Sequence, residues 1–183
     1  MIERRMLGIF AHPDDEGFGS GGVLAYHADR GVKIALVSAT RGESGEISDA
    51  VPATRENLGE VREGELRCAA RRLGISELIF LDYRDSGMPG SIDNEHPLAY
   101  IHAAAEEVVP QLVEIIRRIR PQVVLTFDPS GAYGHPDHIA IHRHAREAIE
   151  MAGDPKAYPE HGPAWQVERV FYPVIPRAFF LSI

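Results

Sequence analysis

The sequence predicts an α/β fold, specifically a Rossmann-like three-layer α/β/α arrangement around a mainly parallel sheet. Apolar runs of strand length alternate along the chain with longer stretches of helical periodicity, which is the pattern of repeated βαβ units. Segments rich in Gly, Ser, Asp and Pro follow several of these runs, as expected of loops at the carboxyl ends of parallel strands. The 183 residues are enough for one well-packed domain and few for two.

The apolar runs predict five strands, and the stretches between them predict four helices. The strands are expected at 6–11, 33–39, 78–82, 123–127 and 168–174. The helices are expected at 20–30, 54–73, 98–119 and 138–150. Pro110 lies inside the third helical stretch, so that helix either bends there or starts afresh with the proline in its first turn. Together the helices would cover both faces of the sheet.

Composition excludes several classes of partner. A formal net charge of −8, a pI near 5.6 and the lack of a basic stripe argue against nucleic-acid binding. No apolar run reaches the roughly 18 residues of a membrane span, and no signal-peptide pattern precedes the first strand. The single cysteine, Cys68, rules out an intramolecular disulfide and is expected to be a packed thiol. We therefore expect a cytoplasmic protein that acts on a small molecule, with a homo-oligomer left open.

Two motifs with metal-binding side chains each follow a predicted strand. The first is HPDDE at 12–16, and the second is HPDH at 135–138. In the commonest doubly wound strand order, the first and fourth strands are neighbours and leave a crevice at their carboxyl ends. Both motifs would face that crevice. The convergence of residues so far apart in the chain depends on this strand order.

The residue types in the two motifs fit a catalytic zinc site. Two imidazoles and one carboxylate, from His12, His138 and Asp15, would leave a fourth position for water. Asp14 then lies beside the metal without being needed as a ligand. Because zinc lowers the pKa of bound water to about 7, a neighbouring carboxylate can take its proton, so Asp14 is the expected general base. The reaction class is metal-assisted hydrolysis.

Several neighbouring residues have alternative interpretations. Glu16 is expected in the first turn of the next helix or as an orienting partner of His12. His142 lies one helical turn after His138 and could complete a rival metal set, although a surface position is the simpler expectation for His142 and His144.

The glycine-rich segment Gly17–Gly22 offers a function of another class. It satisfies G-x-G-x-x-G after the first strand, which would indicate a Rossmann-type dinucleotide-binding protein or oxidoreductase. In that fingerprint the glycines turn directly after the strand, whereas positions 12–16 intervene here, and no acidic residue ends the second strand. The hydrolase is therefore the favoured interpretation.

Four motifs in order give the chain a specific resemblance. They are AHPDDE at 11–16, TRGESGE at 40–46, RDSGM at 84–88 and GHPDH at 134–138. With these motifs the chain resembles the PIG-L/LmbE-like family of zinc-dependent N-acetylglucosaminide deacetylases, whose bacterial members include the mycothiol-pathway GlcNAc-inositol deacetylase and the mycothiol-conjugate amidase. The resemblance implies hydrolysis of an N-acyl, chiefly N-acetyl, amide on a glucosamine-type sugar conjugate. It also implies a single domain over 1–183 that stops before the family's usual C-terminal extension.

The resemblance also implies roles for individual residues. Its zinc ligands and general base agree with those inferred above from the two motifs. His135 would assist the developing oxyanion or the leaving amine while protonated, oriented by Asp137, and Tyr133 would polarise the carbonyl. Arg62 and Asp85 would bind sugar hydroxyls.

Overall fold

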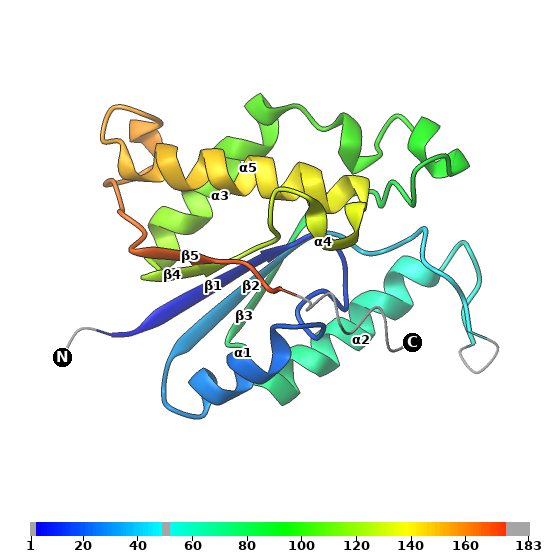
Figure 1. The fold of residues 1–183 in the computed structure, drawn as a ribbon, viewed down its shortest axis with the longest axis horizontal. Coiled ribbons are helices and arrows are strands. Elements are labelled where there is room, and N and C mark those ends of the chain that lie inside the picture. The colour runs from blue at the N-terminus through cyan, green and yellow to red at the C-terminus, as the bar shows by residue number, and fades with distance from the viewer. Residues whose placement is uncertain (1–2, 49–51, 175–183) are drawn as a thin grey trace.

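The computed structural model describes residues 3–48 and 52–174, which contain a five-stranded sheet with every strand parallel. The strand order is β3-β2-β1-β4-β5 (Figure 1). The strands are β1 (Arg5–Phe10), β2 (Lys33–Thr40), β3 (Glu77–Tyr83), β4 (Val123–Leu125) and β5 (Arg169–Phe171). The five predicted strands and the neighbouring first and fourth strands are thus confirmed, although β4 and β5 are shorter than expected.

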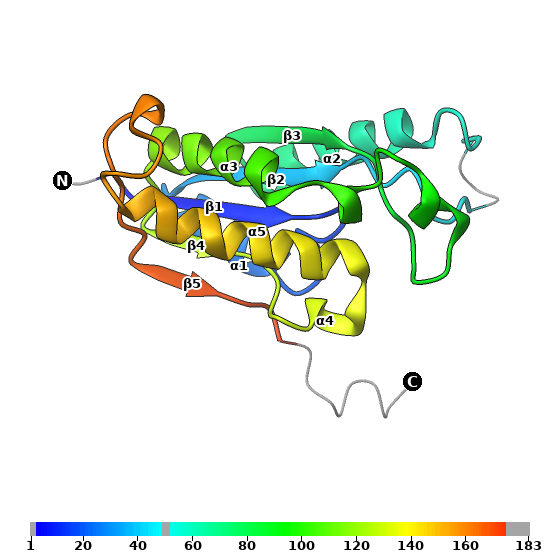
Figure 2. The same cartoon turned by 90° about the horizontal axis from the view of Figure 1, so that it is seen from above.

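Helices cover both faces of the sheet and complete the three predicted layers (Figures 1 and 2). One face carries α1 (Gly21–Ala28) and α2 (Leu58–Leu73), and the other carries α3 (Ala105–Ile119) and α5 (Pro136–Gly153). The short α4 (Gly131–Gly134) precedes α5, and three 3₁₀ turns occupy Ile92–Glu95, Tyr100–His102 and Pro159–His161. Within residues 3–48 and 52–174, no helix combines the length and apolar character needed to cross a bilayer.

The central strands are apolar along almost their whole length because helices cover them on both sides. In β1, Leu7 and Ile9 are fully buried, and in β2 so are Ile34 and Val37. The three parallel pairs between β1 and β4 run from Met6 with Val123 to Gly8 with Leu125. This buried pairing brings the ends of β1 and β4 to the same edge of the sheet.

The third predicted helix begins later than expected. Residues 98–104 include a 3₁₀ turn instead, because Tyr100 N–H donates to the Arg84 carbonyl and Ile101 N–H donates to Ser86 Oγ, which ties this segment to the loop after β3. Pro110 is the sixth residue of a helix that begins at Ala105. The alternative of a new helix with the proline in its first turn is therefore wrong.

Three side chains lie in environments other than those expected. Cys68 is exposed on α2 rather than packed. His142 and His144 are buried rather than on the surface, because each ring makes a hydrogen bond beneath α5. The His142 Nδ1 lies 2.7 Å from the Phe127 carbonyl oxygen, and the His144 Nδ1 lies 2.8 Å from the Tyr100 hydroxyl.

The end of α5 is held by one buried arginine on α3. Arg117 is only 3% exposed, and its guanidinium donates to carbonyl oxygens at the end of α5 and in the loop beyond it. These acceptors belong to Met151, Ala152, Asp154, Ala157, Tyr158 and Gly162. Helix-terminal carbonyls have no partner within their own helix, so this side chain satisfies groups that would otherwise be buried without one.

We expect Arg117→Met to lower the free energy of unfolding by about 3 kcal/mol, because several buried carbonyls lose a charged donor. The matched control is Arg118→Met, since Arg118 is half exposed and pairs with Glu77 on the surface. That change should cost no more than about 1 kcal/mol. Urea unfolding of both variants measures the difference, and equal losses would contradict the role given to Arg117.

The buried His144 should make stability depend on pH. Burial, and then the charge of Arg143, lower the pKa of His144 below its ordinary 6.5. The unfolded chain therefore takes up a proton at this residue more readily, and the folded state loses stability as pH falls below about 6.5. His144→Gln keeps an acceptor for Tyr100 but cannot be protonated. Relative to wild type, its free energy of unfolding should improve by up to about 1.4 kcal/mol between pH 7.5 and 5.5, as followed by urea unfolding. Parallel pH curves would contradict this.

Candidate metal centre and active-site cleft

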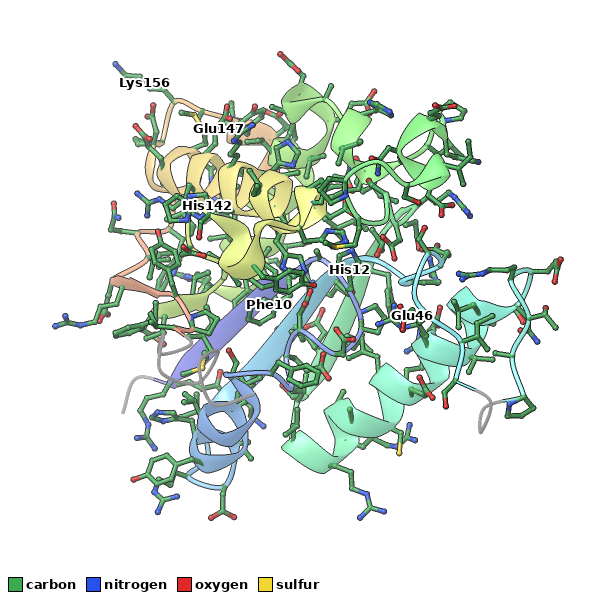
Figure 3. The ribbon with its side chains drawn as sticks, turned by 45° about the vertical axis from the view of Figure 1, so that its right-hand side comes forward. Phe10, His12, Glu46, His142, Glu147 and Lys156 are labelled. Carbon is green, nitrogen blue, oxygen red and sulfur yellow. The ribbon has the colours of Figure 1, made fainter. Side chains whose placement is uncertain are left out.

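The two HPD motifs meet at the carboxyl edge of the sheet. The His12 Nδ1, directly after β1, lies 3.2 Å from the Nε2 of His138 in the first turn of α5. In Figure 3, His12 lies at the ends of the strands below α5. The pairing of β1 with β4 therefore brings together side chains that are 126 positions apart.

His12, Asp15 and His138 have the spacing of a metal-ligand set. The Asp15 carboxylate oxygens lie 3.3 Å from His138 Nε2 and 3.6 Å from His12 Nδ1. Ligand atoms at the corners of a tetrahedron with zinc bonds near 2.0–2.1 Å lie about 3.3 Å apart. All three residues are under 9% exposed, so the donor set is held inside the protein. The spacing and residue types make these three side chains a candidate site for a divalent metal ion.

Each of the three side chains is oriented by a further contact. Asp15 Oδ2 accepts from the backbone N–H groups of Ala11 and His12. The His138 Nδ1 lies 3.3 Å from the Gly131 carbonyl oxygen, and the His12 Nε2 lies 3.1 Å from Asp137 Oδ2. Carbonyl and carboxylate partners of this kind fix the orientation of a metal-binding imidazole and leave its other nitrogen for the metal.

Local backbone geometry places His138. Gly131 has φ +64°, and a Cβ there would lie 2.9 Å from the His138 Cβ, so the turn over this histidine needs a residue without a side chain. Pro136 occupies the first position of α5, where its missing N–H costs nothing. The Phe127 ring stacks on the His138 imidazole with ring centroids 3.8 Å apart.

Other ligand sets are also present around His12. Ring nitrogens of His12, His135 and His138 lie within 4.8 Å of one another, and so do donor atoms of His12, Asp85 and Asp137. Neither group contains Asp15 or His142, and the His142 Nδ1 lies 2.7 Å from the Phe127 carbonyl oxygen. Figure 3 shows His142 farther along α5 than the site, so the structure does not favour the rival set that includes it.

The partner of Asp137 differs from the one that the resemblance implied. Its Oδ2 accepts from Ser86 N–H at 2.9 Å and lies beside His12, while its Oδ1 is buried without a hydrogen-bond partner among the described residues. Only the backbone N–H of Asp137 contacts His135, donating to Nδ1 at 3.1 Å, so the His135 side chain caps α5. The Asp137 carboxylate orients His12 rather than His135.

His12 and His135 differ in charge near neutral pH. Burial alone would lower the pKa of His12, but hydrogen bonds to Asp137 and Asp85 and the charge of Asp15 raise it to about 10. Burial and the positive charges of His12 and His138 lower the pKa of His135 to about 4. His135 is therefore neutral near pH 7, contrary to the expected protonated form, and its Nδ1 acceptor role leaves the proton on Nε2.

The same buried, charged surroundings also shift the pKa values of Asp14, Tyr133 and Asp85. Burial and the charge of Asp15 raise the pKa of Asp14, while Arg62 opposes that shift. Burial raises the pKa of the Tyr133 hydroxyl to about 12, with Asp15 and Asp14 adding to the effect. Although burial opposes it, hydrogen bonding to His12 lowers the pKa of Asp85 well below its usual range. Near neutral pH, Tyr133 is therefore a hydroxyl donor and Asp85 an anion.

A cleft of about 580 Å³ opens beside this cluster. Among the described residues, the predicted site residues on its wall are His12, Asp14, Arg62, Asp85, Tyr133 and His135. Asp15 and His138 line a smaller cavity of about 270 Å³ that shares Asp14 and Tyr133 with the cleft, and Asp137 is fully buried. The structure thus brings all nine predicted site residues into one region at the carboxyl edge of the sheet.

In the segment after β1, one expectation is wrong and the less favoured dinucleotide alternative loses support. Glu16 lies in a turn before α1 rather than in its first helical turn, and its Oε2 accepts from Asp14 N–H at 3.0 Å. The glycine-rich segment does not form the tight turn of a dinucleotide site, because residues 11–20 separate β1 from α1. The dinucleotide alternative therefore lacks its structural basis.

Sequence reasoning missed the loop residues that position Asp85 and Asp137. Ser44 N–H donates to Asp85 Oδ2, the Ser44 hydroxyl donates to the Asp85 carbonyl, and Glu43 accepts from Asp85 N–H. Ser86 holds Asp137 in the same way. The only signal in the sequence was that TRGESGE and RDSGM both follow strands that end at this edge.

The fold and the site together define an α/β protein with a buried His/Asp cluster able to hold a metal ion. The chain belongs to the PIG-L family (GlcNAc-PI de-N-acetylase), which matches residues 7–149. It is 41% identical over 184 residues to the 1D-myo-inositol 2-acetamido-2-deoxy-alpha-D-glucopyranoside deacetylase of Streptomyces avermitilis, a match that covers 96% of this chain and 63% of that protein. The chain thus spans less than two thirds of this curated relative.

Two solved structures share the fold. The N,N'-diacetylchitobiose deacetylase of Pyrococcus horikoshii is 25% identical, with a TM-score of 0.76 over 98% of this chain and 66% of that one. The 4-carboxy-2-hydroxymuconate hydratase GalB of Pseudomonas putida is 24% identical, with a TM-score of 0.72 over 92% of this chain and 65% of that one. Since proteins with different reactions share this architecture, the function must be argued from the site.

We expect the purified protein to bind one divalent ion per chain, and His138→Ala to lose most of it, because one of the three donors disappears. The matched control is His142→Gln, which removes a buried imidazole from the same helix but keeps an N–H donor for the Phe127 carbonyl. Metal analysis after dialysis measures both. Equal metal content in wild type and His138→Ala would remove His138 from the ligand set.

Proposed function

We propose that the chain hydrolyses the N-acetyl amide of a glucosamine conjugate at a divalent metal site. The observation that carries this proposal is the meeting of His12, Asp15 and His138, at 3.2–3.6 Å from one another, beside the Asp14 carboxylate on the wall of a cleft. Membership of the PIG-L family and the deacetylase name of the Streptomyces avermitilis relative support the same reaction.

Zinc is the metal we propose for this site. Imidazole nitrogens with one carboxylate suit Zn²⁺, and a set without cysteine that uses three protein donors is typical of catalytic rather than structural zinc. When bound, such an ion supplies a lowered pKa for water and a positive charge near the amide carbonyl. His12, Asp15 and His138 would hold it.

Asp14 is the general base in this proposal. Its carboxylate lines the cleft next to the metal ligand Asp15, and its side chain is 56% exposed, so a water molecule at the site can reach it. The carboxylate would accept a proton from the attacking water and deliver it to the departing amine. A pKa above the usual aspartate range makes Asp14 a stronger base toward the attacking water than an ordinary surface aspartate would be.

His135 and Tyr133 are the proposed donors to the amide oxygen. Both line the same cleft, and their ring centroids are 6.2 Å apart. Neutral His135 offers its Nε2 proton, and Tyr133 offers its hydroxyl, to the negative charge that develops on the oxygen as water attacks. Asp137 acts one step away by orienting His12.

The substrate we propose is an amino-sugar conjugate, with inositol as the first substituent to test. Asp85 and Arg62 lie on the wall of the cleft, where a carboxylate and a guanidinium suit neighbouring sugar hydroxyls. The inositol substituent comes from the name of the Streptomyces avermitilis relative.

We expect zinc-loaded protein to release amine from N-acetylglucosaminyl-inositol or from another N-acetylglucosaminide in a panel, followed by a fluorogenic amine reagent. Asp14→Asn should keep its metal but lose about 10²–10⁴-fold in kcat, because an amide cannot accept the water proton. The metal content of both proteins is the control for site integrity. A metal-loaded wild type that releases no amine from any member of the panel would contradict the proposed function.

A further inference from the structure

We propose that Arg62 is a positioning residue that holds the base Asp14 in place, beyond any contact it makes with the sugar. The inference rests on the proposed function, since it concerns the carboxylate to which proton transfer is assigned. It differs from the role that the family resemblance implied, in which Arg62 binds hydroxyls of the substrate. The contacts of the guanidinium carry the argument.

Most N–H donors of the Arg62 guanidinium form hydrogen bonds within the protein. Its Nη2 donates to Asp14 Oδ2 at 2.9 Å and to the Pro13 carbonyl, and its Nη1 donates to the Gly42 carbonyl at 2.9 Å. Three of the five N–H groups of an arginine are therefore occupied. The side chain is only 16% exposed although it comes from the charged face of α2.

The loop after β2 is shaped around this guanidinium. Gly42 has φ +70°, and a Cβ there would lie 1.8 Å from Arg62 Nη1. A Cβ on Gly45 would lie 2.8 Å from the same atom. Both glycines of TRGESGE thus leave the space that the guanidinium fills, and the Gly42 carbonyl accepts its hydrogen bond. A residue that only reached into open solvent toward a substrate would need no such cradle.

Asp14 needs to be held because its backbone is unusual. Its φ is 108°, a conformation that non-glycine residues rarely adopt and that persists only when the surroundings enforce it. Arg62 binds the carbonyl before this residue and its carboxylate, while the buried Glu16 accepts its N–H. The half-exposed carboxylate has no other side-chain hydrogen bond among the described contacts, so Arg62 fixes its direction.

A positioning role and a sugar-binding role predict different kinetics. A contact with the substrate that is equal in the ground and transition states changes KM, whereas a misplaced base lowers kcat. We expect Arg62→Ala to lose about 100-fold in kcat, the loss expected when a reacting group is displaced by roughly an ångström. KM should change far less than kcat. Arg62→Lys should recover part of kcat, because an ammonium can still reach one oxygen but cannot span the three acceptors.

The matched control is Arg55→Ala. The Arg55 Nη1 donates to the Gly45 carbonyl at 2.7 Å, so this arginine binds the same loop without touching Asp14. It should keep wild-type kcat. The double variant Arg62→Ala with Asp14→Asn should be no slower than Asp14→Asn alone, because the arginine acts through the carboxylate. Circular dichroism checks that each variant is folded.

A measurement without substrate separates this proposal from the proposed function. In protein carrying ¹³C-labelled aspartate, the Asp14 carboxyl resonance, assigned by its absence in Asp14→Asn, should move in Arg62→Ala and stay in place in Arg55→Ala. An unmoved resonance, a raised KM with kcat preserved, or additive losses in the double variant would overturn the positioning role. An inactive wild type whose Asp14 resonance still responds to Arg62 would overturn the proposed function alone.

Discussion

The site depends on the parallel pairing of β1 with β4. No local feature of the chain brings His12 near His138, and only the register from Met6 with Val123 to Gly8 with Leu125 aligns the two strand ends from which they emerge. That register is held by burial on both faces, since Leu7 and Val124 are fully buried between the helical layers. A core substitution that shifts either strand would therefore separate the proposed metal ligands His12 and His138 without touching them. Function and hydrophobic packing are coupled at this one strand pair.

The charge balance around His12 also constrains the site. Three buried carboxylates, from Asp15, Asp85 and Asp137, lie within 3.6 Å of the His12 ring nitrogens. Buried like charges are costly unless a cation lies among them, and the three carboxylates raise the pKa of His12 to about 10, which favours its protonated form. A divalent ion would offset the repulsion between these carboxylates more fully than one proton does. Metal binding must then displace the His12 proton, so proton and metal compete for one nitrogen.

The strands and the two HPD motifs could be predicted from the sequence because both are local patterns. The meeting of His12 with His138 followed only from the strand order expected of the sheet, and the roles given to His135, Tyr133, Arg62 and Asp85 came from the family resemblance. Apolar runs marked the strands, and proline with clustered carboxylates marked where they end. The contacts of Asp137 and Arg62 could not be predicted in this way. Asp137 was expected beside His135 because they are near neighbours in sequence, but the first turn of α5 points its carboxylate toward His12 and Ser86. His142 and His144 were expected on the surface because helical spacing alone does not tell which face of α5 packs on the sheet.

Residues on the cleft wall also hold together the loops at the carboxyl edge of the sheet. Asp85 is 4% exposed and accepts from Gly87 and Ser44, while Ser86, the next residue, holds the carboxylate of Asp137. Loss of Asp85 would therefore alter the loop after β2 and the orientation of His12 together with any sugar contact. Sequence motifs identify which residues gather at such a site. Their division into ligands, bases and positioning residues follows only from the hydrogen bonds that the folded loops make.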